Sequence, residues 1–379
     1  MKRIAGFMAA LVLAGCMAVP CRGAELPLTS HAALLMEKTT GQILYAQNEH
    51  DALPPASVTK IMTVLLTMEA IDSGRIALDD VVTVSAYAAG MGGSQVFLAE
   101  GEQITVDELL KAVCVSSGND AAVALAEHVA GVTELFVEQM NNRARELGMK
   151  DTHFANCTGL TAENHVTSAY DIALMSRELL LHHPQIRSYT TIWMDTLRDG
   201  TFGLSNTNKL IRFYDGATGL KTGFTQEAGY CISATAERDG MELIAVIMKG
   251  VTSDSRNTDA KTLLNYGFST YTLLTVQPKE PLPDLPVTLG SADTVAAVLP
   301  EEGCTLLLEK SRSSDLTQML DLPDEVSAPV RAGETLGTLT VSREGETLLT
   351  IPVVAGGDVT RLTWGQTTAR MLRMAIFCG

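Results

Sequence analysis

The sequence is short of positive charge. Its 379 residues carry 28 Lys and Arg against 44 Asp and Glu, a formal net charge of -16. This balance argues against a general nucleic-acid-binding protein, because such a protein needs a basic surface. Charged residues make up 19% of the chain and hydrophobic residues 46%, a composition that argues against intrinsic disorder. The length allows a sizeable core and two domains.

Cysteine pairs and metal-binding patterns are absent from the sequence. Two of the seven cysteines, Cys16 and Cys21, fall in the N-terminal leader, and the other five are scattered without a CxxC pair. They predict buried free thiols rather than a disulfide framework. The seven histidines form no H-E-x-x-H pattern, which argues against a zinc carboxypeptidase. We therefore expect neither a metal nor another cofactor.

The N-terminus has the pattern of an export signal. Lys2 and Arg3 precede an uncharged apolar run at residues 4–14, which is too short to span a bilayer and is typical of a signal-peptide core. We predict a signal peptide over residues 1–24. The run L-A-G-C, which ends at Cys16, supports a second interpretation as a bacterial lipoprotein signal. Both interpretations place the protein at the outer face of the cytoplasmic membrane or in the cell-wall space.

Hydrophobic periodicity predicts an α+β domain over residues 25–276. Residues 32–46 predict a hairpin, and residues 57–71 predict a helix with apolar residues at helical spacing. The middle of the chain is mostly helical by the same test, and strands return after residue 218. Strands from both ends would form an antiparallel sheet flanked by helices. The late strands are expected at 219–224, 229–236 and 241–248, followed by a helix at 259–273.

The last third of the chain has a different composition. The proline-rich run P-K-E-P-L-P-D-L-P at 278–286 predicts a stiff linker. Short β-type runs and Gly-containing turns then predict a small all-β domain within residues 277–360. The tail, 361–379, has three arginines, several apolar residues and no acidic residue. It predicts a basic amphipathic helix on a membrane surface, with a helix docked on the β domain as the alternative.

The stretch P-P-A-S-V-T-K at residues 54–60 carries the first chemical pattern. Ser57 and Lys60 fall on one face at the start of the predicted helix, so the amine can reach the hydroxyl and act as its base. Burial and the helix N-terminus would both lower the pKa of Lys60. An S-x-x-K pattern alone is weak, since a helix N-cap with a surface lysine has the same sequence.

Two further motifs follow in the chain. Lys221-Thr222-Gly223 is the only K-T-G and falls on a predicted strand, where the glycine allows close approach of a ligand and the lysine can attract a carboxylate. A solvated strand lysine is the alternative. Ser117-Gly118-Asn119 lies between the first two motifs at a predicted turn between helices, where side chains can reach into a cleft.

In this order S-x-x-K, S-x-N and K-T-G resemble the penicillin-binding proteins and serine β-lactamases. Longer segments, including GGSQVFLAEGE, SSGNDAAVALAEHVAG and NCTGL, are similar to the low-molecular-mass D-alanyl-D-alanine carboxypeptidases over residues 28–275. RAGETLGTLTV and IPVVAGGDV resemble that family's C-terminal β module, and the tail resembles its membrane anchor. The resemblance implies a serine β-lactamase/DD-peptidase-like fold with a helical subdomain and a small all-β domain.

Carried over by position, the resemblance also implies catalytic roles. Ser57 would be the acylated nucleophile, and Lys60 the base that takes its proton. Ser117 and Asn119 would line the cleft, where they shuttle a proton and hold the substrate amide.

The resemblance implies a set of substrate-binding residues as well. Lys221 and Thr222 would bind the terminal carboxylate of the peptide, beside Gly223. The N–H groups of Ser57 and Phe224 would form the oxyanion hole. Arg256 would lie near the carboxylate site, although an arginine at a loop-to-helix junction can also be only a solvated charge.

The implied activity is removal of the terminal D-alanine from peptidoglycan stem peptides that end in D-Ala-D-Ala. β-Lactams would acylate the same serine. Three alternatives remain. A DD-endopeptidase on cross-linked peptidoglycan and a β-lactamase would both use Ser57 as the nucleophile, whereas a non-catalytic wall-binding protein would need no nucleophile. The class A β-lactamase segment E-x-x-L-N is not found in this chain, which argues against the second. Intact Ser57, Lys60 and Lys221 argue against the third.

Overall fold

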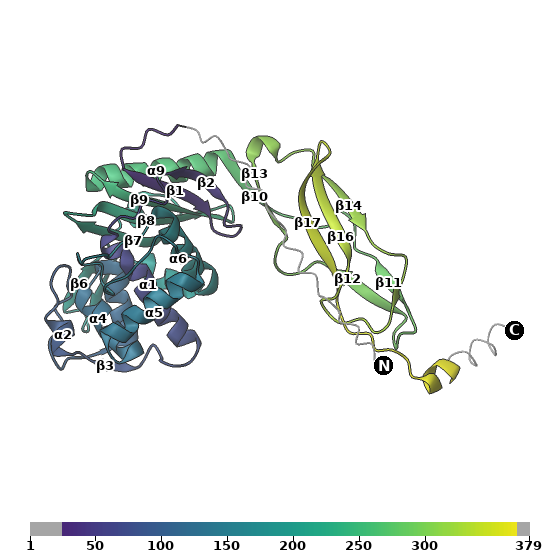
Figure 1. Ribbon diagram of the computed structural model, residues 1–379, viewed down its shortest axis with the longest axis horizontal. Helices are drawn as coiled ribbons and strands as arrows, with labels where there is room; N and C mark the ends of the chain where they lie inside the picture. Colours follow the sequence, from purple (N-terminus) through teal and green to yellow (C-terminus); the bar gives the residue numbers. More distant parts are fainter. Residues whose placement is uncertain (1–24, 370–379) are drawn as a thin grey trace, which may run out of the picture.

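The computed structural model describes residues 25–369. An N-terminal lobe of sheet and helices is followed by a C-terminal lobe of strands (Figure 1). The predicted signal peptide, the Cys16 lipidation site and the tail from residue 370 onward lie outside the described residues.

A five-stranded antiparallel sheet of order β2-β1-β9-β8-β7 organises the N-terminal lobe. The beginning and end of the lobe's sequence meet in this sheet, because β1 pairs with β9 over all six of its residues. The predicted hairpin at 32–46 and the three strands predicted after residue 218 are confirmed. The strands span Ala32–Glu37 (β1), Ile43–Gln47 (β2), Ala217–Thr225 (β7), Gly229–Arg238 (β8) and Met241–Gly250 (β9).

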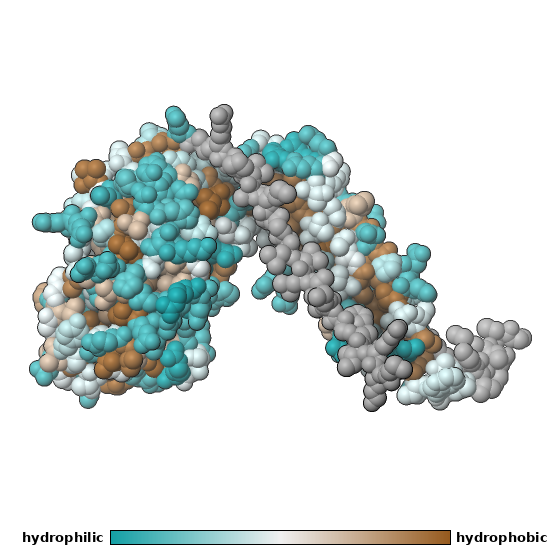
Figure 2. Space-filling model, viewed as in Figure 1, coloured by the Kyte–Doolittle hydropathy of each residue, from teal (hydrophilic) through white to brown (hydrophobic). Residues whose placement is uncertain are grey.

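Both faces of this sheet are buried. Side chains of the central strand β9 alternate between the faces: Ile244 and Val246 pack into the helical half of the lobe, whereas Leu243 and Ala245 pack into the core under α9 (Ser253–Thr270). A strand covered on both faces has a continuous apolar sequence, which explains the run M-E-L-I-A-V-I-M. On the face of the lobe that Figure 2 shows, hydrophilic residues cover much of the surface and apolar patches lie among them.

The face of the sheet opposite α9 is covered by the helical half of the lobe. The long helices α1 and α6 lie against one another and α6 contacts both β1 and β9. Helix α1 is buried on nearly all sides, as expected for a helix that is apolar around its circumference. The remaining elements of the lobe are η1 (Ala56–Thr59), α1 (Lys60–Asp72), β3 (Val81–Thr83), α2 (Ala86–Ala89), β4 (Gln103–Thr105), α3 (Val106–Lys111), the π-helix η2 (Ala112–Ser116), α4 (Asn119–Ala130), α5 (Thr133–Glu146), α6 (Ala169–His182), η3 (Pro184–Ile186), α7 (Arg187–Thr190), β5 (Met194–Leu197), β6 (Phe202–Ser205) and α8 (Leu210–Phe213).

Two predicted helices differ from the structure at their ends. The helix predicted at 57–71 begins as the 3-10 turn η1 and continues as α1. The helix predicted at 259–273 is wrong at both ends, because α9 begins at Ser253 and residues Tyr271–Thr275 form the strand β10. A capping box between Thr252 and Ser255 sets the start of α9. Strand pairing with a distant segment, β13, sets its end.

The C-terminal lobe is the predicted all-β domain. Its main sheet has the order β14-β16-β17-β12-β11-β15. The predicted proline linker is shorter than 278–286, because Pro286 lies in β11 and is paired with Thr294. The strands span Asp284–Thr288 (β11), Thr294–Val298 (β12), Thr305–Glu309 (β13), Thr317–Asp321 (β14), Val326–Ser327 (β15), Thr335–Arg343 (β16) and Glu346–Ala355 (β17), with a short 3-10 turn at Lys310–Arg312 (η4).

A two-stranded sheet joins the lobes. Strand β10 pairs with β13, and Leu307 of β13 is buried with Tyr271 in a core of the N-terminal lobe. Within residues 25–369 no helix combines the length and the apolar character needed to cross a membrane. The cysteines of this range are buried free thiols, as predicted: Cys114, Cys157, Cys231 and Cys304.

Candidate active site

Ser57 lies in η1, the tight turn that precedes α1. The preceding residue, Ala56, has a φ of 50°, a left-handed conformation that costs a non-glycine residue about 1–2 kcal/mol. Two glycines cover the peptide between Ala56 and Ser57. A Cβ on Gly159 would lie 1.8 Å from the Ala56 carbonyl oxygen, and a Cβ on Gly223 would lie 2.9 Å from the Ser57 nitrogen. The turn is therefore held between two backbones that approach too closely for any side chain.

Lys60 is the first residue of α1, and its side chain is fully buried. Its Nζ donates to Ser57 Oγ at 3.0 Å, to Asn119 Oδ1 at 2.5 Å and to the Thr158 carbonyl at 2.7 Å. Burial lowers the pKa of Lys60 well below that of an ordinary lysine, and the positive charge of Lys221 lowers it further. The amine is thus poised to accept a proton at a hydroxyl that it already contacts.

Ser117 and Asn119 lie at the junction between η2 and α4. Ser117 adopts a left-handed conformation with a φ of 62°, which turns the chain out of η2. Besides accepting from Lys60, Asn119 donates through Nδ2 to the Gly92 carbonyl at 2.6 Å. The Ser117 hydroxyl is buried and has no hydrogen-bond partner among residues 25–369. Of these two residues, therefore, Asn119 is hydrogen-bonded to Lys60 and Ser117 is not.

The residue after Asn119 anchors the loop that borders the site. The Asp120 carboxylate accepts hydrogen bonds from the N–H groups of Val96 and Leu98, at distances of 3.0 to 3.2 Å. The Asn119 N–H also donates to the Ser94 carbonyl at 2.7 Å. The loop and the start of α4 consequently form one hydrogen-bonded unit.

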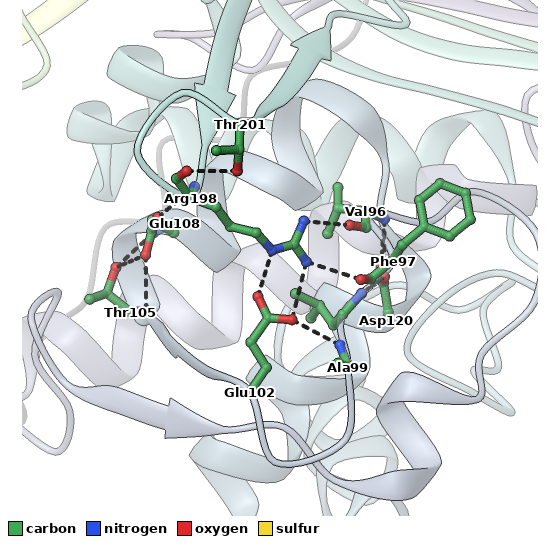
Figure 3. A network of polar contacts seen from close by, with 10 residues as sticks. Val96, Phe97, Ala99, Glu102, Thr105, Glu108, Asp120, Arg198 and Thr201 are labelled. Carbon is green, nitrogen blue, oxygen red and sulfur yellow. Dashed lines mark hydrogen bonds and ion pairs between the residues drawn. The ribbon is translucent and has the colours of Figure 1, made fainter.

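Arg198 holds the same loop from its outer side (Figure 3). It lies at the turn between β5 and β6 and donates to the carbonyls of Val96 and Phe97, each at 3.0 Å. It also forms an ion pair with Glu102 at 2.6 Å. The guanidinium thus satisfies the carbonyl groups of a loop whose N–H groups are satisfied by Asp120.

Lys221 and Thr222 are buried on β7, the edge strand beside η1. Lys221 Nζ donates to the Thr222 carbonyl at 3.0 Å, and the Thr222 hydroxyl donates to the Thr207 hydroxyl at 2.8 Å. Burial lowers the pKa of Lys221 to about 7, and the charge of Arg256 acts in the same direction. The cationic side chains of Lys60, Lys221 and Arg256 therefore influence one another in this region, and none of them is bonded to a carboxylate among residues 25–369.

Arg256 and Phe224 lie at the margin of this group. Arg256, in the first turn of α9, is 4% exposed, and its guanidinium donates to Asn257 Oδ1 at 2.9 Å and to the Cys231 carbonyl at 3.4 Å. It makes no hydrogen bond to Lys221 within the part of the chain described. The Phe224 ring is 52% exposed and packs on Tyr230, with ring centroids 4.3 Å apart.

Backbone groups complete the site, and the motif analysis missed them. The carbonyls of Thr158 and Gly92 bind Lys60 and Asn119. Asn156 shapes the turn that carries Thr158, because its Oδ1 accepts from the N–H groups of Thr158 and Gly159. The run N-C-T-G carries the sequence signal, since an asparagine side chain often bonds to the backbone two residues further on, and glycine readily adopts the positive φ that a turn requires.

The arrangement is suited to acyl transfer through a serine. A hydroxyl in contact with a buried amine of lowered pKa can attack a carbonyl carbon, and the nearby cations can hold an anionic substrate group. No group of three or more His, Cys, Asp and Glu side chains that could hold a metal ion occurs in residues 25–369.

Comparison with known proteins assigns both lobes. Residues 21–252 match the D-alanyl-D-alanine carboxypeptidase family, and residues 270–361 match the C-terminal domain of penicillin-binding protein 5. D-alanyl-D-alanine carboxypeptidase DacF of Bacillus subtilis (strain 168) is 42% identical over 342 residues, which cover 89% of this chain and 88% of that protein.

Solved structures support the same assignment. Penicillin-binding protein 5 from Haemophilus influenzae is 29% identical, with a TM-score of 0.77, and the match covers 89% of this chain and 100% of that one. Penicillin-binding protein D2 from Listeria monocytogenes, solved with ampicillin bound, is 32% identical with a TM-score of 0.60, and the match covers 65% and 100%. These likenesses confirm the predicted fold class.

Proposed function

The chain belongs to the D-alanyl-D-alanine carboxypeptidase family, and we propose that Ser57 is the nucleophile of its reaction. The observation that carries this proposal is the Lys60 amine, which is fully buried and lies 3.0 Å from Ser57 Oγ. Only a neutral amine can take the proton of a serine hydroxyl, and the lowered pKa of Lys60 increases the neutral fraction. Lys60 is the base in this proposal.

Acylation follows from this pair. The Ser57 oxygen attacks the carbonyl carbon between the last two D-alanines of a stem peptide, while its proton passes to Lys60 Nζ. The N–H groups of Ser57 and Phe224 stabilise the oxyanion, each by about 3 kcal/mol. When the tetrahedral species collapses, the C–N bond breaks, the proton that Lys60 had taken passes to the departing amine, and the terminal D-alanine leaves. The remaining acyl group is an ester of Ser57.

Water completes the turnover. With Lys60 neutral again, it takes a proton from water as the water oxygen attacks the ester carbonyl. The Ser57 oxygen leaves and recovers a proton, which releases a peptide shortened by one D-alanine. The buried hydroxyl of Ser117, which lacks a partner among the described residues, is the proposed carrier of the proton to the leaving amine. Asn119 orients both Lys60 and the substrate amide.

Recognition of the terminal carboxylate falls to the K-T-G strand. Lys221 supplies a cation and Thr222 a hydroxyl, and Arg256 adds positive charge from α9. Gly223 keeps β7 close to the nucleophile's turn, because any side chain there would meet the Ser57 nitrogen. A substrate carboxylate would also raise the pKa of Lys221 and keep it protonated when bound.

The lobes and ends of the chain fit an exported enzyme of the cell wall. We assign residues 1–24 to a signal peptide, 25–276 to the DD-peptidase domain and 277–360 to a spacer domain. The tail from 361 would bind the membrane surface, and the 90% exposure of Trp364 at its start supports this role. Peptidoglycan stem peptides are the proposed substrate, and β-lactams the covalent inhibitors.

D-alanine release from a peptide ending in D-Ala-D-Ala tests the proposal. The wild-type chain should release D-alanine, and prior treatment with penicillin should abolish release. Ser57→Ala should release none and take up no penicillin while its melting temperature is unchanged. Release by folded Ser57→Ala protein would disprove the assignment of the nucleophile. Covalent labelling without release would indicate cross-linked peptidoglycan as the substrate.

A further inference from the structure

His165 is a buried histidine that none of the proposed catalytic steps uses. It is 4% exposed and lies beside the ring of Phe154, with ring centroids 5.9 Å apart. Its Nδ1 accepts a hydrogen bond from the Ala155 N–H at 2.9 Å, and its Nε2 lies 2.8 Å from the Thr59 hydroxyl. Both ring nitrogens are therefore bonded to segments that border Ser57.

Two independent contacts fix which nitrogen carries the proton. Because Nδ1 accepts from Ala155, a neutral ring must carry its hydrogen on Nε2. Thr59 leads to the same tautomer, since its only hydroxyl hydrogen is donated to the Ala56 carbonyl at 2.9 Å. Thr59 must then accept from His165. Burial, assisted by the charge of His153, lowers the pKa of His165 to about 4, so the ring stays neutral near pH 7.

These bonds form a directed chain from His165 through Thr59 to Ala56. The Ala56 carbonyl and the Ser57 N–H belong to one planar peptide unit, so fixing the direction of the carbonyl fixes the direction of the N–H. This peptide is the one that Gly159 and Gly223 cover on either side. Ala56 has a left-handed φ, a conformation that persists only when its surroundings hold it in place.

The second contact of His165, the hydrogen bond from the Ala155 N–H to Nδ1, holds the segment on the other side of Ser57. Ala155 begins the segment 155–160, which contributes the Thr158 carbonyl to Lys60 and Gly159 to the cover of the turn. His165 thus links the turn at Ala56 to the segment 155–160, beside a second buried link in which the Thr63 hydroxyl of α1 donates to the Cys157 carbonyl at 2.6 Å. A histidine suits this position, because one rigid ring supplies an acceptor and a donor on different sides.

We propose that His165 is a positioning residue for acylation: through Thr59 it orients the Ala56–Ser57 peptide, and through Ala155 it sets the loop that holds Lys60. The inference rests on the proposed function, because the proposed function makes the Ser57 hydroxyl the nucleophile and the Ser57 N–H a donor to the oxyanion. His165 itself touches neither the substrate nor the reacting atoms. Its effect is on rate, exerted through the geometry of the Ser57 N–H and hydroxyl.

Paired substitutions in the full chain separate the two contacts. His165→Asn places an amide where Nδ1 was and keeps the Ala155 contact, but cannot reach Thr59. His165→Gln extends to the Nε2 position and keeps the donor to Thr59. We expect the rate constant for acylation by fluorescent penicillin to fall about tenfold in His165→Asn, the size of one lost hydrogen bond, and to recover in His165→Gln.

Thr59→Val removes the middle of the chain while keeping the side-chain shape. It should slow acylation as much as His165→Asn does, and the double variant should be no slower than either single one, because both act through one path. Thr59→Ser, which keeps the hydroxyl, and His153→Gln, at the exposed neighbouring histidine, should acylate at the wild-type rate. If His165→Asn does not fold, Thr59→Val and Thr59→Ser decide the question alone.

The outcomes distinguish this inference from the function on which it rests. If mass spectrometry finds no penicillin on Ser57 of the wild-type protein, the proposed function itself fails. If Ser57 is labelled but folded His165→Asn and Thr59→Val proteins acylate at the wild-type rate, only the positioning role is overturned. Rate losses that add in the double variant, or that the glutamine variant fails to restore, would also overturn it.

Discussion

A lysine in the first turn of a helix is ordinarily a solvated cation. Lys60 differs because its three hydrogen-bond acceptors are a hydroxyl, an amide oxygen and a backbone carbonyl. None of these carries a full charge that would favour the protonated amine, whereas burial disfavours it. Lys38, by contrast, forms an ion pair with the Glu242 carboxylate at 2.9 Å.

Replacing Lys60 with arginine separates the role of a base from that of a positive charge. Arginine keeps the charge but does not lose its proton in proteins, so Lys60→Arg should slow acylation by about 10²–10⁴-fold, the usual contribution of a general base. The rate of fluorescent penicillin labelling measures this. Lys111→Arg, at a surface lysine paired with Asp195, is the control. Labelling of Lys60→Arg at the wild-type rate would show that only the charge is needed.

The two active-site lysines predict a bell-shaped pH dependence of kcat/KM. Lys60 must be neutral to act as base, so activity should rise as the pH rises through its lowered pKa. Lys221 must be protonated to hold a carboxylate, so affinity should fall above its pKa of about 7. Titration of kcat/KM with a D-Ala-D-Ala peptide measures both limbs. In Lys221→Arg the alkaline limb should disappear, and an unchanged alkaline limb would assign it to another group.

Side chains with motif spacing could be predicted from the sequence, and backbone partners could not. Residue type and spacing predict Ser57, Lys60, Asn119 and Lys221 as site residues, and the structure places Lys60 in hydrogen-bond contact with Ser57 and Asn119. The Thr158 carbonyl that binds Lys60 has no such signature, since every residue carries a carbonyl. Its place in the site depends on how the turn at Asn156 folds back onto α1, which only the tertiary structure shows.

At the scale of elements, the loop between α2 and β4 is organised by charges rather than by regular structure. Asp120 from α4 binds its N–H groups, and Arg198 from the β5–β6 turn binds its carbonyls. Side chains from two other segments, α4 and the β5–β6 turn, thus meet at this loop (Figure 3). Such a loop gives no periodic signal, which explains why sequence patterns predicted the helices around it but not its form.

Removing Arg198 should loosen this loop while leaving the nucleophile in place. Arg198→Ala leaves two carbonyls and the Glu102 carboxylate without their partner, and should destabilise the N-terminal lobe by about 1–3 kcal/mol. Hydrogen exchange should accelerate at the amides of Val96 and Leu98. Arg198→Lys should be only partly effective, because one ammonium cannot span these acceptors as a planar guanidinium does.

Arg75→Ala is the matched control, since the side chain of this exposed arginine donates only to Ser73 within the described chain. Chemical denaturation and hydrogen exchange of the three variants check the prediction. If the amides of Val96 and Leu98 exchange at the wild-type rate in Arg198→Ala, Asp120 alone holds the loop and the contacts of Arg198 contribute nothing to its stability.

The end of α9 shows why helix boundaries escaped the sequence patterns. Apolar residues continue at helical spacing through Leu273, so periodicity extends the predicted helix to that point. The chain instead leaves the helix at Thr270, because β13 offers a strand partner for residues 271–275. Tertiary pairing overrides local preference here. The strand partner, β13 at Thr305–Glu309, lies in a later part of the chain that a local pattern does not include.

At the scale of the whole molecule, the proposed site residues all lie in the N-terminal lobe, and the C-terminal lobe contributes none of them. The proposed catalytic and substrate-binding residues lie within 57–256, whereas the C-terminal lobe has its own apolar cores. The boundary predicted at 276 falls between β10 and its partner β13, and the proline run revealed the linker but not this pairing. The lobes are therefore joined by a paired two-stranded sheet as well as by the proline-containing linker.

A chain ending at residue 276 tests how far the lobes are independent. It keeps every proposed site residue, so Ser57 should be acylated by fluorescent penicillin at the rate of the full chain. It loses β13, and with it Leu307, which is 6% exposed in the core that contains Tyr271. The truncated lobe should consequently unfold at lower temperature than the same lobe in the full chain.

The substitution Leu307→Ala in the full chain isolates that contact. Removing a buried leucine side chain costs about 2–5 kcal/mol, so the variant should lower the melting temperature of the N-terminal lobe although Leu307 lies in the C-terminal segment. Leu320→Ala, at a leucine that is 40% exposed on β14, should leave it unchanged. Calorimetry of both variants measures the coupling. Equal melting of the N-terminal lobe in Leu307→Ala and the unaltered chain would mean that β13 covers β10 without stabilising it, and that the lobes unfold independently.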